Sequence, residues 1–445
     1  MMKRRDFIKK AAIATTGAFA LPYILPSGRL FAASGSQLAE HVVYVMFAGG
    51  VRQQESVLQG YLERSQEINI PGNIMTNMLN GQAPTQKIVY GTNGVLEGDT
   101  PIPAILSQTL QQQGILFPEV KSSAPGHYGG LNALLQGNTL VSQGLKQKPV
   151  NPTIFEYTRR HLGASASKVW FVGNGIGNST PLLNYSTYPE YGAQYGANFL
   201  APTVTFGGQG VEHLSNAKIY HPDEELAPIY QMKYFLDQSF VNVGATLEGV
   251  HNTDEEKQDI KLFMKSMFEK SQAGAIAFPP VADNGDLATI GYTCEVMNWF
   301  KPTLTVVNMS AVDSCHSNFT GYLKALHRAD HAVGYLWNYI QQIPGMANNT
   351  VLIVTPECGR NLAHNPIADE NDWYAFDHSD ENTQRIFTMM AGPNVPSNLV
   401  IGSEANPVGI SADGAPTIAE VLGFKSEIMS SGLLAGDAMS LFDRI

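Results

Sequence analysis

The sequence predicts an α/β fold: a doubly wound, mostly parallel sheet with helices on both faces and with long loop insertions. Short runs rich in Val, Ile, Phe and Met recur along the chain, and several are continuous rather than alternating, which is typical of strands covered on both faces. Amphipathic helical patterns separate these runs. Only 15% of the 445 residues are charged, while 42 are Gly and 25 are Pro, which favours long surface loops over a helical bundle.

Strands and helices are expected in alternation. Helical segments are predicted between the apolar runs, the clearest at Phe319–Ile340, where apolar residues recur every three or four positions and so share one face. Residues 173–210 are rich in Gly, Asn, Tyr, Ser and Pro without a period, so we expect an ordered excursion from the sheet, within an insertion at about 174–250. The predicted strands are His41–Phe47, 168–173, 303–309, 350–355 and 387–391, and the other predicted helices are 152–162, 254–270 and 288–300.

The first 33 residues predict a twin-arginine export signal. Arg4 and Arg5 precede an uncharged, mostly apolar run over 11–25 and a small-residue stretch that ends near Ala33. The apolar run is about 15 residues long, whereas roughly 20 are needed to span a bilayer. We therefore expect export to the periplasm or the extracellular space, with residues 34–445 forming a single domain. The alternative is a retained N-terminal anchor, and the membrane is contacted only through this segment in either case.

Charge and cysteine content exclude other classes. The chain has 28 Lys and Arg against 39 Asp and Glu, and its net charge of −11 disfavours nucleic-acid binding, because phosphate neutralisation needs clustered Lys and Arg. Three cysteines are too few for a scaffold held together by disulfides. A hydrophobic content of 44% indicates a globular protein with a sizeable core.

Candidate metal ligands lie at the ends of the predicted strands or in the adjoining loops. The carboxyl ends of parallel strands meet at one edge of a sheet, where ligands bind in folds of this type. A carboxylate and an imidazole three residues apart, as in Asp313 and His316, can converge on one cation, although such an Asp is also a candidate helix cap. We expect a shared polar site formed by the following residues: Asp313, His316, Glu357, Cys358, Asp377 and His378.

Two arginines and a serine complete the candidate site. Arg52 follows Gly49-Gly50, which allow either a close backbone approach or a tight turn, and Arg360 follows Glu357 at the end of another strand. Either guanidinium can offset the charge of an anionic substrate. Ser123 precedes a small-residue helix, where its hydroxyl is a candidate nucleophile, although Ser at this place equally favours an N-cap or a turn.

Taken in order, these segments resemble the alkaline phosphatase superfamily. The resemblance covers about 41 to 395 and is carried by Asp313-Ser314-Cys315-His316, the helix that follows, and the strand at 350–355. Pro125-Gly126-His127-Tyr128 resembles a segment of the nucleotide pyrophosphatase/phosphodiesterase branch. Glu357-Cys358-Gly359-Arg360 with Asp377-His378 resembles an uncharacterised subgroup exported by the twin-arginine route.

The resemblance implies two divalent cations, zinc above all, and Ser123 as the nucleophile. Asp313, His316 and His378 stand where the family holds the first cation. The second set departs from the pattern: Gly49 replaces an Asp, for which Glu55 is a candidate substitute, and Glu357-Cys358 replaces an Asp-His pair.

Two functions remain open at the level of sequence. The first is a metal-dependent hydrolase of phosphate or sulfate esters, acting on a small anionic ester. The second is a non-catalytic, phosphatase-like binding or assembly subunit with a degenerate or empty metal site and a protein partner. Cys315 and Cys358 both neighbour candidate ligands, and they can pack as small apolar residues, form a disulfide or ligate a soft metal.

Overall fold

The structure is a computed structural model and describes residues 23–24, 30–31, 36–62, 69–84, 102–124, 126–139, 148–173, 183–207, 250–281 and 285–445. Within the predicted export signal only two short antiparallel strands, β1 (Tyr23–Ile24) and β2 (Leu30–Phe31), fall in these ranges. The rest of the signal, and residues 174–182 and 208–249 of the predicted insertion, lie outside the described residues.

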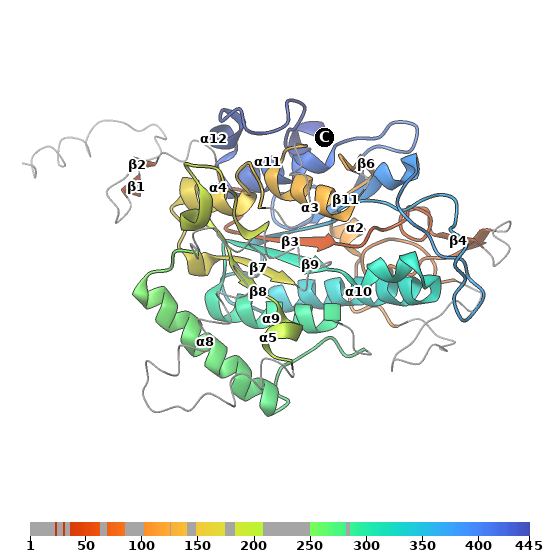
Figure 1. Ribbon diagram of the computed structural model, residues 1–445, viewed down its shortest axis with the longest axis horizontal. Helices are drawn as coiled ribbons and strands as arrows, with labels where there is room; N and C mark the ends of the chain where they lie inside the picture. The colour runs from red at the N-terminus through yellow and green to blue at the C-terminus, as the bar shows by residue number, and fades with distance from the viewer. Residues whose placement is uncertain are drawn as a thin grey trace, which may run out of the picture.

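An eight-stranded sheet runs through the centre of the molecule in the order β12-β6-β11-β10-β3-β9-β7-β8 (Figure 1). β10, β3, β9, β7 and β8 form a parallel series, β11 is antiparallel to β10 and β6, and β12 is parallel to β6. The predicted, mostly parallel α/β fold is confirmed. The strands are β3 (His41–Phe47), β6 (Gly114–Lys121), β7 (Val169–Gly173), β8 (Asn198–Leu200), β9 (Leu304–Met309), β10 (Thr350–Pro356), β11 (Arg385–Ala391) and β12 (Leu399–Val400), with a separate pair of β4 (Gly60–Leu62) and β5 (Asn69–Pro71).

All five predicted strands are present. The sheet also contains three strands that the sequence pattern does not predict, β6, β8 and β12. β6 contains Pro118 and Glu119, which interrupt its apolar run. β8 and β12 have three and two residues, too few to produce a periodic pattern. β8 lies in the stretch expected to leave the sheet; instead it pairs in parallel with β7, forms the edge of the sheet, and has all three of its residues buried.

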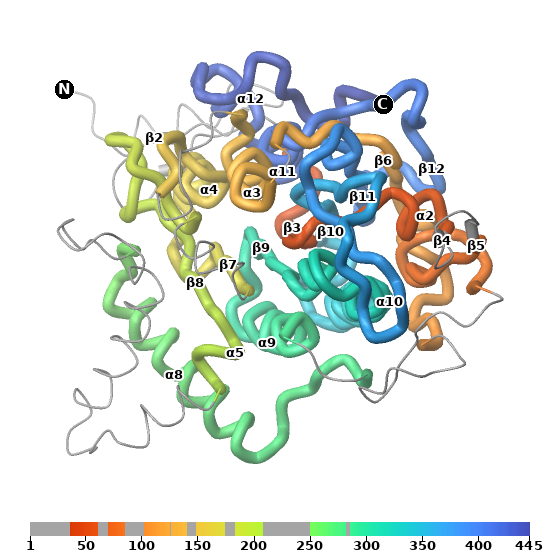
Figure 2. The backbone as a smooth tube through the Cα atoms, turned by 45° about the vertical axis from the view of Figure 1, so that its right-hand side comes forward, coloured from red at the N-terminus to blue at the C-terminus, as the bar shows by residue number. Residues whose placement is uncertain are grey.

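Helices cover both faces of the sheet, as Figure 2 shows. Alternate residues of β3 explain the two cores: Val43 and Val45 pack on the side of α9 and α10, and Val42 and Tyr44 pack on the side of α3, α4 and α11. The four predicted helices are confirmed, with shifted bounds for three of them. The helices are α2 (Leu110–Gln113), α3 (His127–Gln136), α4 (Ile154–Leu162), α5 (Pro202–Thr205), α8 (Asp254–Gln272), α9 (Gly285–Phe300), α10 (Phe319–Ile340), α11 (Gly414–Leu422) and α12 (Lys425–Met429).

Among the described residues, no helix combines the length and the apolarity needed to cross a bilayer.

Candidate metal centre at the carboxyl edge of the sheet

The carboxyl ends of β3, β9 and β10 lie together, because Phe47 is in register with both Met309 and Pro356. The chain leaves β9 through the short 3-10 helix Ala311–His316 and leaves β10 through Glu357 and Cys358. α3 enters the same edge at its first residue, His127, and the loop before β11 brings Asp377 and His378. Four segments distant in sequence therefore supply one polar cluster, as is usual for a site at the end of a parallel sheet.

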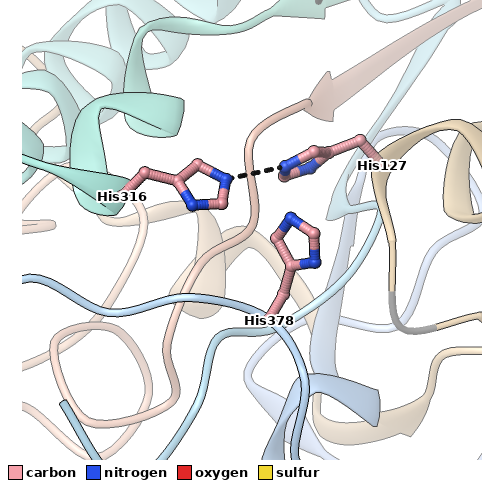
Figure 3. Close-up of side chains that lie close together, drawn as sticks. All are labelled: His127, His316 and His378. Atoms are coloured by element: carbon pink, nitrogen blue, oxygen red, sulfur yellow. Dashed lines mark hydrogen bonds between the residues drawn. The ribbon is translucent and has the colours of Figure 1, made fainter. Parts of the chain in front are cut away.

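Three imidazoles face one another in this cluster, as Figure 3 shows. The Nε2 atoms of His127 and His316 are 3.4 Å apart, and the ring centroid of His378 lies 4.4 Å from that of His127 and 4.9 Å from that of His316. One ring nitrogen of each lies within 4.8 Å of the others. Imidazole nitrogens at this spacing are able to converge on a single transition-metal ion.

Asp313 is the carboxylate at the centre of the cluster. Its Oδ1 lies 3.1 Å from His127 Nε2, 3.3 Å from His316 Nε2 and 2.7 Å from the Nη2 atom of Arg360. Burial alone would raise the pKa of Asp313, but hydrogen bonds from the two histidines hold this pKa well below its usual range. The helix cap expected as the alternative for Asp313 is supplied by Asn318, whose side chain accepts from Gly321 N.

Glu357 is fully buried, and only one of its two carboxylate oxygens has hydrogen-bond partners among the described residues. Its Oε1 accepts a hydrogen bond from Gly49 N at 2.5 Å and lies 2.8 Å from His127 Nδ1. Its Oε2 is buried and has no hydrogen-bond partner among the described residues. A buried carboxylate oxygen without a partner is costly, so the donor set at this point fits a cation.

His127 joins the two carboxylates, with Nε2 toward Asp313 and Nδ1 toward Glu357. Burial lowers the pKa of His127, but hydrogen bonds with Asp313, Cys358 and Glu357 outweigh burial and raise it to about 12. His378 has the opposite shift, since burial and the nearby His127 and Arg360 lower its pKa to about 4. His378 is therefore a neutral nitrogen base, which is the form that ligates metals, whereas His127 would have to release its Nε2 proton to a bound cation.

Asp377 lies behind His316 rather than among the facing imidazole nitrogens. Its Oδ1 is 2.7 Å from His316 Nδ1, and its Oδ2 accepts from the Nδ2 atom of Asn365 at 3.1 Å. A hydrogen bond from His316 holds the pKa of Asp377 below its usual value. A carboxylate on Nδ1 fixes the tautomer that leaves Nε2 directed into the cluster.

The guanidinium of Arg360 is also part of this edge, and it is fully buried. Its Nε and Nη2 donate to Gly49 O, its Nη1 donates to Phe376 O at 3.2 Å, and Nη2 also reaches Asp313. Gly49 has φ +134°, and a Cβ there would lie 2.4 Å from Asp313 N. The backbone around Gly49 therefore leaves no space for a side chain, and this excludes an Asp at the position where the family has one.

Arg52 and Glu55 lie inside the core instead. Arg52 Nη1 is 3.0 Å from Glu55 Oε1, both side chains are fully buried, and the guanidinium stacks 3.6 Å from the Phe376 ring centroid. Tyr322 closes the pair, accepting from Arg52 N and donating to Glu55 Oε2. Glu55 is therefore engaged away from Gly49, and Arg52 has no exposed surface on which to meet a substrate.

Ser123 is joined to Ser411 rather than to the imidazoles. Its backbone N–H donates to Ser411 Oγ at 2.9 Å, and the two hydroxyls are 2.9 Å apart. The preceding residue, Ser122, is the one that contacts the cluster, because its hydroxyl donates to Glu357 O at 2.8 Å. The three cysteines, Cys294, Cys315 and Cys358, are buried free thiols, so the structure does not contain the disulfide considered above.

His127 is the member of this cluster that the sequence analysis does not predict. It lies in the segment Pro125-Gly126-His127-Tyr128, which carries part of the family resemblance but supplies only the neighbouring Ser123 as a candidate site residue. The available signal was an imidazole at the first position of a helix that begins beside the expected site. Asn365, which donates to both Asp377 Oδ2 and His316 O, was missed without any local signal.

Comparison with protein-family models and with curated proteins finds no match. Solved structures are similar at low identity. A mutant of alkaline phosphatase PafA is 12% identical with a TM-score of 0.46 over 93% of this chain and 100% of that chain. The alkaline phosphatase of the Antarctic bacterium TAB5 has 12% identity and a TM-score of 0.41, covering 87% of this chain and 99% of that one.

An alkaline phosphatase superfamily protein from Vibrio parahaemolyticus is also 12% identical, with a TM-score of 0.40 over 95% of this chain and 76% of that chain. These structures come from the superfamily that the sequence resembles. At this identity the likeness concerns the fold alone.

Proposed function

We propose that this protein is a metal-dependent hydrolase of phosphate or sulfate esters, with His127, His316 and His378 as ligands of one divalent cation. The observation that carries the proposal is the convergence of three ring nitrogens within 4.8 Å at the carboxyl edge of the sheet. Three protein ligands that leave a position open are typical of catalytic zinc sites. Glu357 Oε2 beside them, which has no hydrogen-bond partner in the described part of the chain, fits a site built for positive charge.

A zinc-class cation at this place would supply Lewis-acid polarisation of an ester oxygen. The chain's own groups prepare the site. Asp377 orients His316 through its Nδ1 atom. Asp313 Oδ1 contacts the Nε2 atoms of both His127 and His316 and so holds the two rings close to each other. The side chains of Asp313 and His316 remain 34% and 35% exposed, so a small anionic ester in solution has access to the edge of the cluster.

We assign the attacking group to water rather than to Ser123. The hydroxyl of Ser123 forms a hydrogen bond with Ser411, and among the described residues it has none with the three imidazoles. Water has access to the cluster through the exposed side of His316 and Asp313. Ser123 then contributes to the loop before α3 and not to the chemistry.

Export is part of the proposal and is supported by the sequence alone. The segment 1–33 has the paired arginines and the short apolar run of a twin-arginine signal. A protein exported after folding can acquire its metal in the cytoplasm and act on esters in the periplasm or outside the cell. Fusion of residues 1–33 to a reporter, with Arg4 and Arg5 replaced by Lys as the control, tests the route.

Metal removal and reconstitution test the activity. The purified protein is assayed with an aryl phosphate, an aryl phosphodiester and an aryl sulfate, before and after chelation and after addition of zinc, manganese or calcium. We expect turnover of at least one ester that chelation abolishes and a single metal restores. Absence of turnover in metal-loaded protein, or full turnover in protein shown to be metal-free, would contradict the proposal.

A non-catalytic binding subunit is the second candidate, and two observations favour it. Arg360 forms an ion pair with Asp313, and His127 contacts both Asp313 and Glu357. Side chains of the protein itself therefore partly neutralise the two carboxylates. Gly49 leaves no room for the carboxylate that a second family-type site would need. Folded protein from its native host that contains no metal and hydrolyses none of the three esters would favour this function.

A further inference from the structure

We infer that Asn365 is a positioning residue of the candidate metal centre, which holds His316 and Asp377 in the orientation that metal binding needs. The inference rests on the proposed function, because His316 is one of its three metal ligands. Asn365 lies in the loop between Arg360 and Asp377, and both ends of this loop contact the cluster. Asn365 therefore acts on the cation through other residues and not by contacting it.

The side-chain amide of Asn365 forms three hydrogen bonds. Its Nδ2 donates to His316 O at 3.0 Å and to Asp377 Oδ2 at 3.1 Å, and its Oδ1 accepts from Ile367 N at 2.9 Å. These partners fix the orientation of the amide, because a flipped amide would place its oxygen against two other oxygens. One side chain thus holds both the backbone of a proposed ligand and the carboxylate that orients this ligand.

The Asp377 carboxylate needs such a partner because it lies at the open side of the cluster. The side chains of Asp377 and His316 are 45% and 35% exposed, and an exposed side chain that only one contact holds retains rotamer freedom. Oδ1 of Asp377 lies 2.7 Å from His316 Nδ1, and Asn365 engages Oδ2. With both oxygens held, the carboxylate stays on Nδ1, and Nε2 of His316 remains directed into the cluster.

The loop that carries Asn365 is itself anchored to the fold. The backbone N–H of Asn365 donates to Ala375 O at 2.8 Å, which joins the two arms of the loop. Farther along, Asp369 Oδ2 accepts from Thr320 N at 2.7 Å, in the first turn of α10. The amide of Asn365 is therefore presented from a fixed backbone, as the support of a metal ligand requires.

Zinc affinity of metal-stripped, full-length folded protein tests this role without any substrate, by competition with a chromophoric chelator. We expect N365A to weaken zinc binding by roughly tenfold or more, the usual effect of removing a group that orients a metal ligand. N365L has nearly the shape of Asn but no donor, so it should show the same loss, and it replaces N365A should that variant not fold. N361A is the matched control, because Asn361 lies in the same loop but its side chain contacts Ser379 and Asp380, and it should keep wild-type affinity.

The double variant N365A/D377A separates positioning from a general loosening of the loop. If Asn365 acts through Asp377, the double variant should lose far less zinc affinity than the product of the two single losses. Losses that multiply, or an N365A protein with wild-type zinc affinity, would overturn the inference. The expected pattern of affinities without any ester hydrolysis would defeat the proposed function and leave the role of Asn365 standing. Zinc-dependent ester hydrolysis, with N365A binding zinc as tightly as the wild type, would do the reverse.

Discussion

Two polar clusters lie near the carboxyl edge of the sheet, and they differ in how far solvent reaches them. Arg52, Glu55 and Tyr322 form a fully buried group in which the charges face each other, although Arg52 Nε and Nη2 have no hydrogen-bond partner among the described residues. The histidine cluster holds several donors against one oxygen of Asp313, leaves Glu357 Oε2 without a described partner, and stays partly exposed at His316.

The difference separates a structural ion pair from a candidate site. Arg52 and Arg360 look equivalent in the sequence, since each follows a predicted strand within a few residues. The structure stacks Arg52 on Phe376 inside the core and places Arg360 against Asp313 and Gly49 O. The partial exposure of Asp313 and His316 marks the histidine cluster as the candidate site, whereas the fully buried Arg52–Glu55 pair is a feature of folding.

Replacing His316 should produce the largest effect and should act on chemistry alone. H316A removes a proposed metal ligand that Asp377 orients, so we expect kcat/KM for the ester to fall about a thousandfold, roughly 4 kcal/mol of transition-state stabilisation. Steady-state kinetics with metal analysis measures it. H364A is the matched control, because His364 is exposed and stacks on Tyr374, and it should keep full activity. Equal activity of the two variants would place the site elsewhere.

Replacing Arg52 should lower the stability of the fold and leave metal binding by the histidine cluster unchanged. R52A leaves Glu55 charged and buried without its partner, which we expect to lower the free energy of unfolding by about 3 kcal/mol. Denaturant unfolding measures the loss. Metal content of the fraction that remains folded should be unchanged. A stable R52A protein that binds metal or ester more weakly would show that the core pair belongs to the site after all.

Introducing a carboxylate at Gly49 tests whether the family-type ligand is merely missing or is sterically excluded. A Cβ at this position would lie 2.4 Å from Asp313 N, and φ is +134°. We therefore expect G49D to destabilise the protein by about 2 kcal/mol and to bind no additional metal. Thermal unfolding and metal stoichiometry check both parts. A stable G49D protein with one extra equivalent of metal would contradict the steric interpretation.

Replacing Ser123 should have the smallest effect. Its hydroxyl contacts Ser411 and not the imidazoles, so S123A should change kcat by less than about threefold, under 1 kcal/mol. S122A is the informative partner, because Ser122 donates to Glu357 O and lies closer to the cluster. Loss of turnover in S123A by a hundredfold or more would restore Ser123 as the nucleophile.

The sequence determined the parts of this protein that depend on neighbours along the chain. Apolar runs predicted five strands and apolar periodicity predicted four helices, because burial on both faces of a sheet or on one face of a helix leaves a local pattern. The order of polar residues after those strands placed Asp313, His316 and Glu357 at one edge, since parallel strands share their carboxyl ends. His378 reaches the same edge because it precedes β11, which is antiparallel to β10.

Only the tertiary structure decided which of these side chains meet and which are enclosed. His127 joins His316 across 189 positions and Glu357 across 230, and Gly49 meets Arg360 across 311. Ser123 pairs with Ser411 across 288. Contacts over such separations leave no periodic trace in either segment, because they arise from the packing of the sheet and its helices rather than from the local preference of any residue.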